Sequence, residues 1–164
     1  MGIVVNASPL IFLSKLNKLD ILGELFEDVF TTDEVAVEVL AGLEYGYSDA
    51  LVVKKSIEEK RILLLKSTKS SRFENLGAGE RSVIEAALEH KVGRVLLDDL
   101  TAIKVARYFG LNVSSTPFVL LLALKNKKIE KQEFVRLFDK LITDFNYRIS
   151  PVLYKEIMQF AEKE

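Results

Sequence analysis

The sequence contains no cysteine and only one histidine, His90, among its 164 residues. Without cysteine the chain has no disulfide framework, no thiol nucleophile and no cysteine-ligated zinc. A single histidine also excludes a metal centre that is built from several histidines. The absence of cysteine suits a reducing compartment, and we expect a cytoplasmic protein.

The chain also lacks an excess of charge and a long apolar run. Twenty-three Lys and Arg balance 24 Asp and Glu, so any nucleic-acid binding must use a local basic patch. The apolar stretch IVVNASPLIFL near the N-terminus is interrupted by Asn6, Ser8 and Pro9 and has no basic leader. It therefore predicts neither a signal peptide nor a membrane span, and we expect a soluble intracellular protein with no membrane partner.

Length and composition are those of one globular unit. With 49% apolar and 29% charged residues, a chain of this length buries enough surface for a sheet covered by helices. We expect residues 1–164 to form a single domain.

Short apolar runs that do not alternate in polarity recur between longer amphipathic segments. This order is typical of parallel strands, buried on both faces and joined by right-handed helical crossovers. The predicted strands are Ile3–Val5, Val29–Thr31, Ile62–Leu65, Val95–Leu97 and Asn112–Val113. The predicted helices are Ser8–Leu16, Asp20–Phe26, Asp33–Ala41, Ser48–Lys60, Ala78–His90 and Leu100–Phe109, followed by extra C-terminal helices at Pro117–Leu124, Lys131–Leu141 and Pro151–Ala161.

Polar residues follow two of the predicted strands directly. Asn6 comes after the first strand, and Asp98 and Asp99 come after the fourth. In an open parallel sheet, ligands bind beyond the carboxyl ends of the strands, so these side chains share one edge if the two strands are neighbours. Adjacent carboxylates need a cation, a helix N-terminus or water to compensate them. In the alternative interpretation, one Asp caps the next helix, a role worth about 1 kcal/mol.

Two glutamates are further candidates. Glu80 opens a helix after Gly77 and Gly79, which let the backbone approach a ligand, although an acid in the first turn is favourable on its own. Glu38 lies among apolar residues in VAVEVL. It shares a helical face with Glu34, and in the alternative interpretation the two glutamates form an ordinary solvated stripe.

Taken together, these segments resemble the PIN domain family, in particular a branch of microbial PIN-like proteins. The similar segments occur in the family's order and cover most of the chain: IVVNASPLIFLSKLNKLDIL, EVAVEVL, LGAGERSVIEAALEH, VLLDDLTAIKVARYFGLNVSSTPFVLLLA and FNYRISPVLYKEI. The resemblance implies a three-layer α/β/α sandwich with a central parallel sheet of about five strands.

The resemblance also implies a set of site residues. It puts acid positions of the family at Asn6, Glu38, Glu80 and either Asp98 or Asp99, and it puts small hydroxyl residues of the site at Ser8 and Thr116. The hydroxyl residues have an alternative role as local caps ahead of prolines. Asn6 departs from the family pattern, which has Asp there. The loss of one negative charge predicts weaker binding of Mg²⁺ or Mn²⁺.

The reaction that the resemblance implies is hydrolysis of RNA phosphodiesters at a site holding Mg²⁺ or Mn²⁺, and one ion is expected because Asn6 is neutral. RNA binding would need basic residues around the acidic pocket. In the alternative interpretation, the basic residues of this chain are ordinary solvated surface charges. The candidates are Lys15, Lys18, Lys66, Lys69, Arg72, Lys104 and Arg107.

Three alternatives stay open at this stage. The first is an RNA-binding or regulatory module that has lost catalysis, with Asn6 as its signature. The second is a receiver domain, which needs an acidic pair and an acceptor Asp where this chain has Asn6 and Lys66. The third is a toxin with a small antitoxin partner. The apolar segment FVLLLALK suits a homodimer contact, but Val119–Leu124 is more simply explained as part of the core.

Overall fold

The structure, a computed structural model, describes residues 1–68 and 71–164, and its centre is a five-stranded parallel sheet in the order β3-β2-β1-β4-β5. The predicted strands are confirmed to within one residue at each end. They are β1 (Gly2–Val5), β2 (Asp28–Thr32), β3 (Leu63–Leu65), β4 (Arg94–Leu96) and β5 (Asn112–Ser114).

Helices connect these strands, and the predicted ones are confirmed. Before the last strand lie α1 (Ala7–Lys15), α2 (Ile21–Leu25), α3 (Asp33–Leu40), α4 (Ser48–Glu58), α5 (Ala78–Glu89) and α6 (Leu100–Tyr108). After it come α7 (Thr116–Lys125), α8 (Lys131–Thr143) and α9 (Pro151–Glu162). The sequence reading missed two short 3₁₀ helices, η1 (Ala41–Tyr45) and η2 (Ser71–Phe73).

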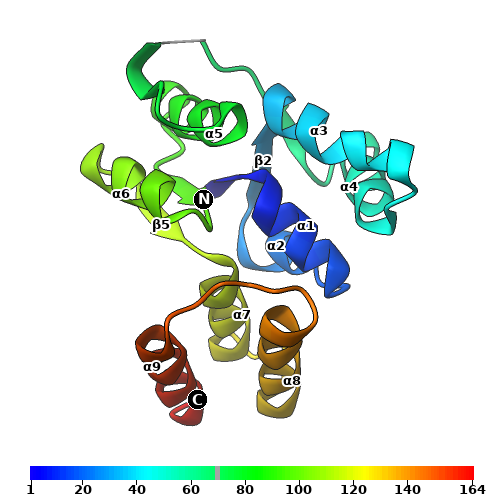
Figure 1. The fold of residues 1–164 in the computed structure, drawn as a ribbon, viewed down its shortest axis with the longest axis vertical. Helices are drawn as coiled ribbons and strands as arrows, with labels where there is room; N and C mark the ends of the chain where they lie inside the picture. Colours follow the sequence, from blue (N-terminus) through cyan, green and yellow to red (C-terminus); the bar gives the residue numbers. More distant parts are fainter. Residues whose placement is uncertain (69–70) are drawn as a thin grey trace.

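The helices cover both faces of the sheet. Helices α5 and α6 lie on one side, and α1, α3 and α4 lie on the other (Figure 1). This arrangement follows from right-handed crossovers, because the chain moves from β1 outward to β3 and then returns past β1 to β4 and β5. The three-layer α/β/α sandwich is therefore confirmed.

Strand β1 lies at the point where the strand order reverses. It pairs with β2 on one side and with β4 on the other, where Val4 is opposite Val95 and Val5 is opposite Leu96. The condition under which the residues after these two strands share one edge of the sheet is thus met. This switch point is where open parallel sheets place their ligands.

One expectation about the strands is wrong. Leu63 and Leu64 of β3 are exposed, although the sequence predicted burial on both faces. Because β3 is an edge strand, the helices that cover β1 and β4 do not enclose it in the same way. An apolar run without alternation therefore does not distinguish a central strand from an edge strand.

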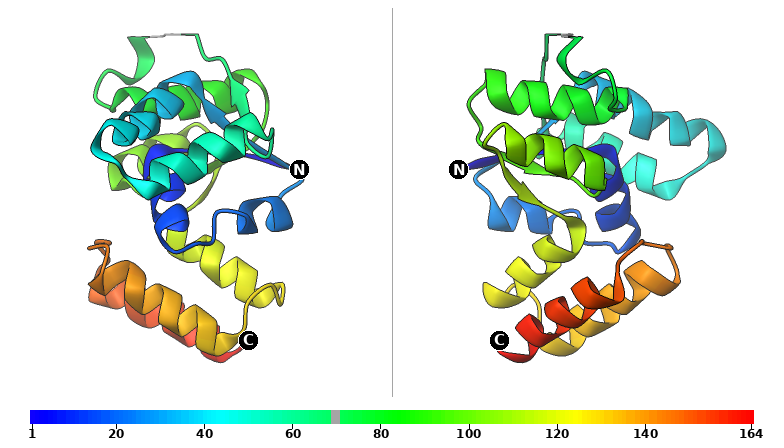
Figure 2. Two further views of the ribbon diagram at one scale, coloured as in Figure 1. Left: turned by 90° about the vertical axis from the view of Figure 1, so that its right-hand side faces the viewer. Right: turned by 60° about the vertical axis from the view of Figure 1, so that its left-hand side comes forward.

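The last three helices gather at one end of the molecule, beyond the sheet (Figures 1 and 2). Phe134 and Phe138 of α8 are fully buried, and the Phe138 ring stacks on Tyr154 of α9 at 5.2 Å between centroids. Ser150 is the N-cap of α9, and its side chain accepts a hydrogen bond from the Leu153 N–H. No described helix is long and apolar enough to cross a membrane.

We expect Phe138→Ala to lower the free energy of unfolding by about 3–5 kcal/mol, because it removes a buried ring and leaves a cavity. Val152→Ala on exposed α9 surface is the matched control and should change it by no more than about 0.5 kcal/mol. Urea unfolding measures both. Equal effects of the two substitutions would contradict the packing of α8 described above.

Candidate metal-binding and catalytic site

A pocket of about 440 Å³ lies beyond the carboxyl end of β1. The residue after β1, one face of α3 and the first turn of α5 form its walls, so it collects side chains from three distant parts of the chain. Its lining residues are Asn6, Ser8, Glu34, Val37, Glu38, Gly77, Ala78, Gly79 and Glu80. The structure thus brings together three of the predicted site residues, Asn6, Glu38 and Glu80, with Ser8 beside them.

The pocket depends on a close approach at Gly79. A Cβ atom on this residue would lie 2.6 Å from Glu38 Oε2, 3.2 Å from Asn6 Oδ1 and 3.4 Å from a methyl group of Val35. The first distance is shorter than real Cβ atoms show and the second is tight, so both oxygens approach the bare Cα of Gly79. The glycine therefore permits the amide and the carboxylate to meet at one point.

Two oxygen atoms of the pocket are buried without a hydrogen-bond partner. Asn6 is only 5% exposed, and its Oδ1 is buried without a partner, as is Oε2 of Glu34. Partial removal from water raises the pKa of Glu38, and the neighbouring carboxylate of Glu80 raises it further. Buried acceptors normally have a donor or a cation as partner. This cluster of acceptors is therefore suited to a cation or a proton.

Two buried hydroxyls hold α3 and α5 together behind the pocket. Thr32 Oγ1 lies 2.6 Å from Ser82 Oγ, and Ser82 donates to the carbonyl oxygen of Gly79 at 2.8 Å. Thr32 is also the N-cap of α3, because its oxygen accepts from the Val35 N–H. These hydrogen bonds connect the start of α3, the helix that carries Glu38, to Gly79, which lies next to the Glu38 carboxylate.

Glu80 has a second role in the backbone. Its Oε2 accepts a hydrogen bond from the Gly77 N–H at 3.0 Å, which closes the first turn of α5. The alternative interpretation of Glu80 as a helix-opening acid is thus also correct. A capping carboxylate still has lone pairs for another ligand.

The structure places Asp98 and Asp99 outside the lining of this pocket. Both oxygens of Asp98 accept hydrogen bonds: Oδ1 from the Thr116 N–H and the Tyr147 hydroxyl, both at 2.8 Å, and Oδ2 from the Thr116 hydroxyl at 2.7 Å. Asp99 caps α6 by accepting from the Ala102 N–H. Their role as metal ligands therefore stays a prediction, and the predicted capping role of Asp99 is confirmed.

Asp98 connects three parts of the fold. Burial raises the pKa of its carboxyl group, and the hydrogen bonds from Thr116 and Tyr147 partly offset that increase. Burial and the charge of Asp98 in turn raise the pKa of the Tyr147 hydroxyl. Asp98 thus joins the end of β4, the start of α7 and the segment before α9. Thr116, expected as a hydroxyl of the site, donates hydrogen bonds to Asp98 from its N–H and its hydroxyl. Its role in the site stays a prediction.

Few side chains of the pocket can act as metal ligands. Within residues 1–68 and 71–164, no three Asp, Glu or His side chains lie close enough to hold an ion between them. The pocket is lined by three carboxylates, those of Glu34, Glu38 and Glu80, and by the Asn6 amide. Sequence reasoning missed Glu34, which it took for part of a solvated stripe, although its spacing of four residues from Glu38 was the signal for a shared face.

Among the described residues, none of the predicted basic residues lines the pocket, including Lys66, Lys104 and Arg107. Lys18 pairs with Glu133 of α8, and Lys15 lies over the Phe145 ring at 5.6 Å. Arg72 lines a separate pocket, and Lys69 lies outside the described residues.

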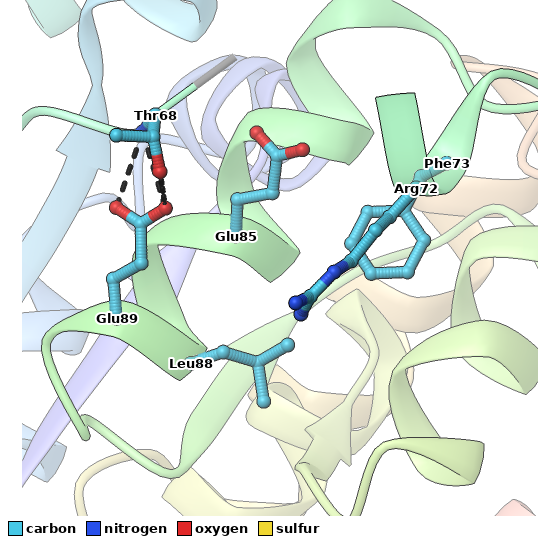
Figure 3. Close-up of a pocket in the computed structure, with 6 residues that line it drawn as sticks. All are labelled: Thr68, Arg72, Phe73, Glu85, Leu88 and Glu89. Atoms are coloured by element: carbon cyan, nitrogen blue, oxygen red, sulfur yellow. Dashed lines mark hydrogen bonds between the residues drawn. The ribbon is translucent and has the colours of Figure 1, made fainter. Parts of the chain in front are cut away.

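Figure 3 shows this second pocket, which shares no lining residue with the acidic one. The carboxylate of Glu89, at the end of α5, accepts hydrogen bonds there from the backbone and the hydroxyl of Thr68. The contact fastens the segment after β3 to α5, so we interpret this pocket as structural.

Comparison with known proteins identifies the family of this chain. A family model, DUF3368, described as a PIN domain, matches residues 2–163. The protein belongs to the PIN domain family. No curated protein sequence matches the chain significantly. Among solved structures, a domain of a functionally unknown protein from Methanocaldococcus jannaschii DSM 2661 is similar at 13% identity and a TM-score of 0.47, over 70% of this chain and 89% of that chain.

Membership of the PIN family gives the pocket a general meaning. PIN domains are nuclease-type modules that act on nucleic acids and generally depend on divalent metal ions. The acceptor cluster at Asn6, Glu38 and Glu80 lies where this PIN domain reverses its strand order. It is therefore the candidate active site.

We expect Tyr147→Phe to lower the free energy of unfolding by about 1–3 kcal/mol, because the buried Asp98 carboxylate loses a donor. Tyr154→Phe is a matched control, since that hydroxyl donates to exposed Asp139 at 3.3 Å and its loss should cost about 0.5 kcal/mol or less. Denaturant unfolding of the two variants side by side measures the difference. Equal stability losses would contradict the role assigned to Asp98.

We expect Glu38→Gln to make the metal-free protein more stable at pH 7. The raised pKa of Glu38 means that its charged form destabilises the fold. The contribution of Glu38 to stability is therefore fully present below its ordinary pKa of 4.5 and is lost as the pH rises through the raised value. Thermal unfolding between pH 4 and 8 should show the advantage of the variant shrinking toward acid pH. Glu156→Gln on exposed α9 is the control, and a less stable Glu38→Gln at pH 7 would refute this account.

Proposed function

We propose that this PIN domain is a metal-dependent ribonuclease whose active site is the pocket formed by Asn6, Glu38 and Glu80. One observation carries the proposal: the buried, unpartnered Oδ1 of Asn6 and the carboxylate of Glu38 converge on the bare Cα of Gly79. A structural polar cluster would pair acceptors with donors. A cluster of acceptors alone is what a cation site needs.

Mg²⁺ or Mn²⁺ fits the chemistry of these ligands. Asn6, Glu38 and Glu80 would hold the ion, and all three offer hard oxygen atoms, which both ions prefer. Mg²⁺ is usually bound through one or two carboxylates and keeps several waters, so a third Asp or Glu is not required. When bound, the ion supplies an activated water and neutralises charge on the phosphate.

The protein's own groups contribute binding and positioning. The first turn of α5 opens into the pocket at Gly77, Ala78 and Gly79, and the N-terminus of a helix has unpaired N–H groups that suit phosphate oxygens. Glu38, with its raised pKa, is suited to accept and release a proton nearer neutral pH than an ordinary glutamate. The Thr32 and Ser82 hydroxyls fix the distance between the two helices.

A second candidate function is a nucleic-acid-binding or regulatory module without catalysis. Two observations favour it: Asn6 removes one charge from the family's site, and Asp98 has its oxygens occupied by Thr116 and Tyr147. Both reduce the negative charge available to an ion. The two functions differ in whether the pocket supports hydrolysis, which an assay decides.

An antitoxin partner, a homodimer and a cytoplasmic location belong to the ribonuclease proposal as its biological setting. They rest on the resemblance and on the absence of cysteine. A small neighbouring reading frame whose product binds this chain would support the toxin role, and light scattering of the purified protein measures its oligomeric state.

The test is cleavage of single-stranded RNA in the presence of Mn²⁺ by four variants. Glu80→Gln removes a carboxylate, and Gly79→Ala displaces the Glu38 carboxylate from the point where it meets Asn6. The controls are Glu156→Gln, on exposed α9, and Gly23→Ala, on α2, where an added Cβ meets no atom within 4 Å.

We expect Glu80→Gln and Gly79→Ala to lower the cleavage rate by roughly 10- to 100-fold, as changes around metal ligands do, and the controls to cleave like the wild type. Chelation of Mn²⁺ should abolish activity in every variant. If the wild type binds RNA but shows no cleavage beyond that of Glu80→Gln, the non-catalytic module is the function.

A further inference from the structure

Two exposed tyrosines form a stacked pair close to the proposed active site. Tyr45 ends η1 and Tyr47 precedes α4, with 73% and 56% of their surfaces exposed. Their rings are 5.7 Å apart between centroids and inclined by 26°. Exposure of two neighbouring aromatic rings is unfavourable in water unless they serve an interaction.

The local backbone is built to produce this stack. Gly46, between the tyrosines, has a φ of +71°, a left-handed conformation that glycine adopts without strain. Gly42 makes room for the lower ring, because a Cβ on it would lie 3.0 Å from Cδ2 of Tyr47 and 3.3 Å from Cβ of Ala50. Gly42 therefore packs against Tyr47, and Tyr47 stacks with Tyr45. Tyr45 is the more exposed of the two rings.

The stack lies on the same continuous helical stretch as the acidic pocket. Helix α3 runs directly into η1, and Val37, which is 72% exposed, lines the pocket. Tyr45 comes eight residues after Val37 along this stretch. At 1.5 Å per residue in an α-helix and about 2.0 Å in a 3₁₀ helix, Tyr45 is roughly 12–15 Å from Val37.

We propose that Tyr45 and Tyr47 form a stacking platform for one unpaired base of the nucleic acid that this site binds. The inference rests on the proposed function. A base can stack on the open face of Tyr45 only if it has left its own helix, and aromatic platforms recognise single strands in this way.

Aromatic contact, and not phosphate attraction, is the interaction available here. Residues 41–52 contain no Lys or Arg, and the nearby Lys54 and Lys55 pair with Glu58 and Glu59 on α4. The contribution of Tyr45 to binding should therefore depend little on salt, whereas phosphate contacts weaken steeply as salt rises.

The test uses the full chain carrying Glu80→Gln, so that RNA is bound but not cut. The probes are a labelled single-stranded RNA, the same sequence as a duplex, and a single strand containing 2-aminopurine, whose fluorescence falls when it stacks. Tyr45→Ala removes the ring and Tyr45→Phe keeps it. Tyr108→Ala is the matched control, because Tyr108 is an 84% exposed tyrosine on α6.

We expect Tyr45→Ala to weaken single-strand binding by roughly 5- to 100-fold, to leave duplex binding unchanged and to abolish the fluorescence decrease. Tyr45→Phe should bind within about twofold of the parent, because stacking uses the ring face, and Tyr108→Ala should bind like the parent. The effect of Tyr45→Ala should be the same at low and high salt.

Equal single-strand affinity for Tyr45→Ala and its parent would overturn the platform. So would a loss of self-association in Tyr45→Ala with unchanged RNA binding, which would make the tyrosines a protein contact. The two proposals fail separately: RNA cleavage that is insensitive to Tyr45→Ala refutes only the platform, while RNA binding through Tyr45 without any cleavage refutes only the ribonuclease.

Discussion

The candidate site depends on the approach of α5 to the end of β1 with no side chain between them. Gly79 lies at this contact, and a Cβ atom on it would be 2.6 Å from Glu38 Oε2 and 3.2 Å from Asn6 Oδ1. The sheet supplies the position, because β1 is enclosed between β2 and β4. The Thr32 and Ser82 hydroxyls supply the spacing, since they tie the start of α3 to the first turn of α5. Residues far apart in the sequence thus share one pocket.

The neutral amide at Asn6 changes the electrostatics of this pocket in two directions. A carboxylate in place of the Asn6 amide would raise the pKa of Glu38 further and would destabilise the fold in the absence of a cation. Asparagine avoids that repulsion while it keeps an acceptor oxygen at the point of convergence. The same exchange reduces the attraction for Mg²⁺ or Mn²⁺. Stability without metal and affinity for metal are therefore opposed at this residue.

The sequence predicted the elements more fully than the contacts of their side chains. Strand runs and helix periods are local, and they predicted the order of the elements. The exposure of Leu63 and Leu64 was missed because an edge strand is defined by what lies beside it. The engagement of Asp98 by Tyr147 was also missed, because it spans 49 residues and follows from how α8 turns back. The YGY stack needed the φ of Gly46, which no periodicity reveals.

The engagement of Asp98 also shows how the C-terminal helices bear on the site. Asp98 lies two residues after the end of β4, and the backbone N–H of Asn6 donates to the carbonyl oxygen of Leu96, the last residue of that strand. Tyr147 holds Asp98 from the chain that leads into α9, and its ring packs edge-on against Phe12 of α1, the helix that starts after Asn6. A single tyrosine thus contacts elements on both sides of the switch point. The extra helices are therefore part of what fixes the edge of the sheet where the acceptor cluster forms.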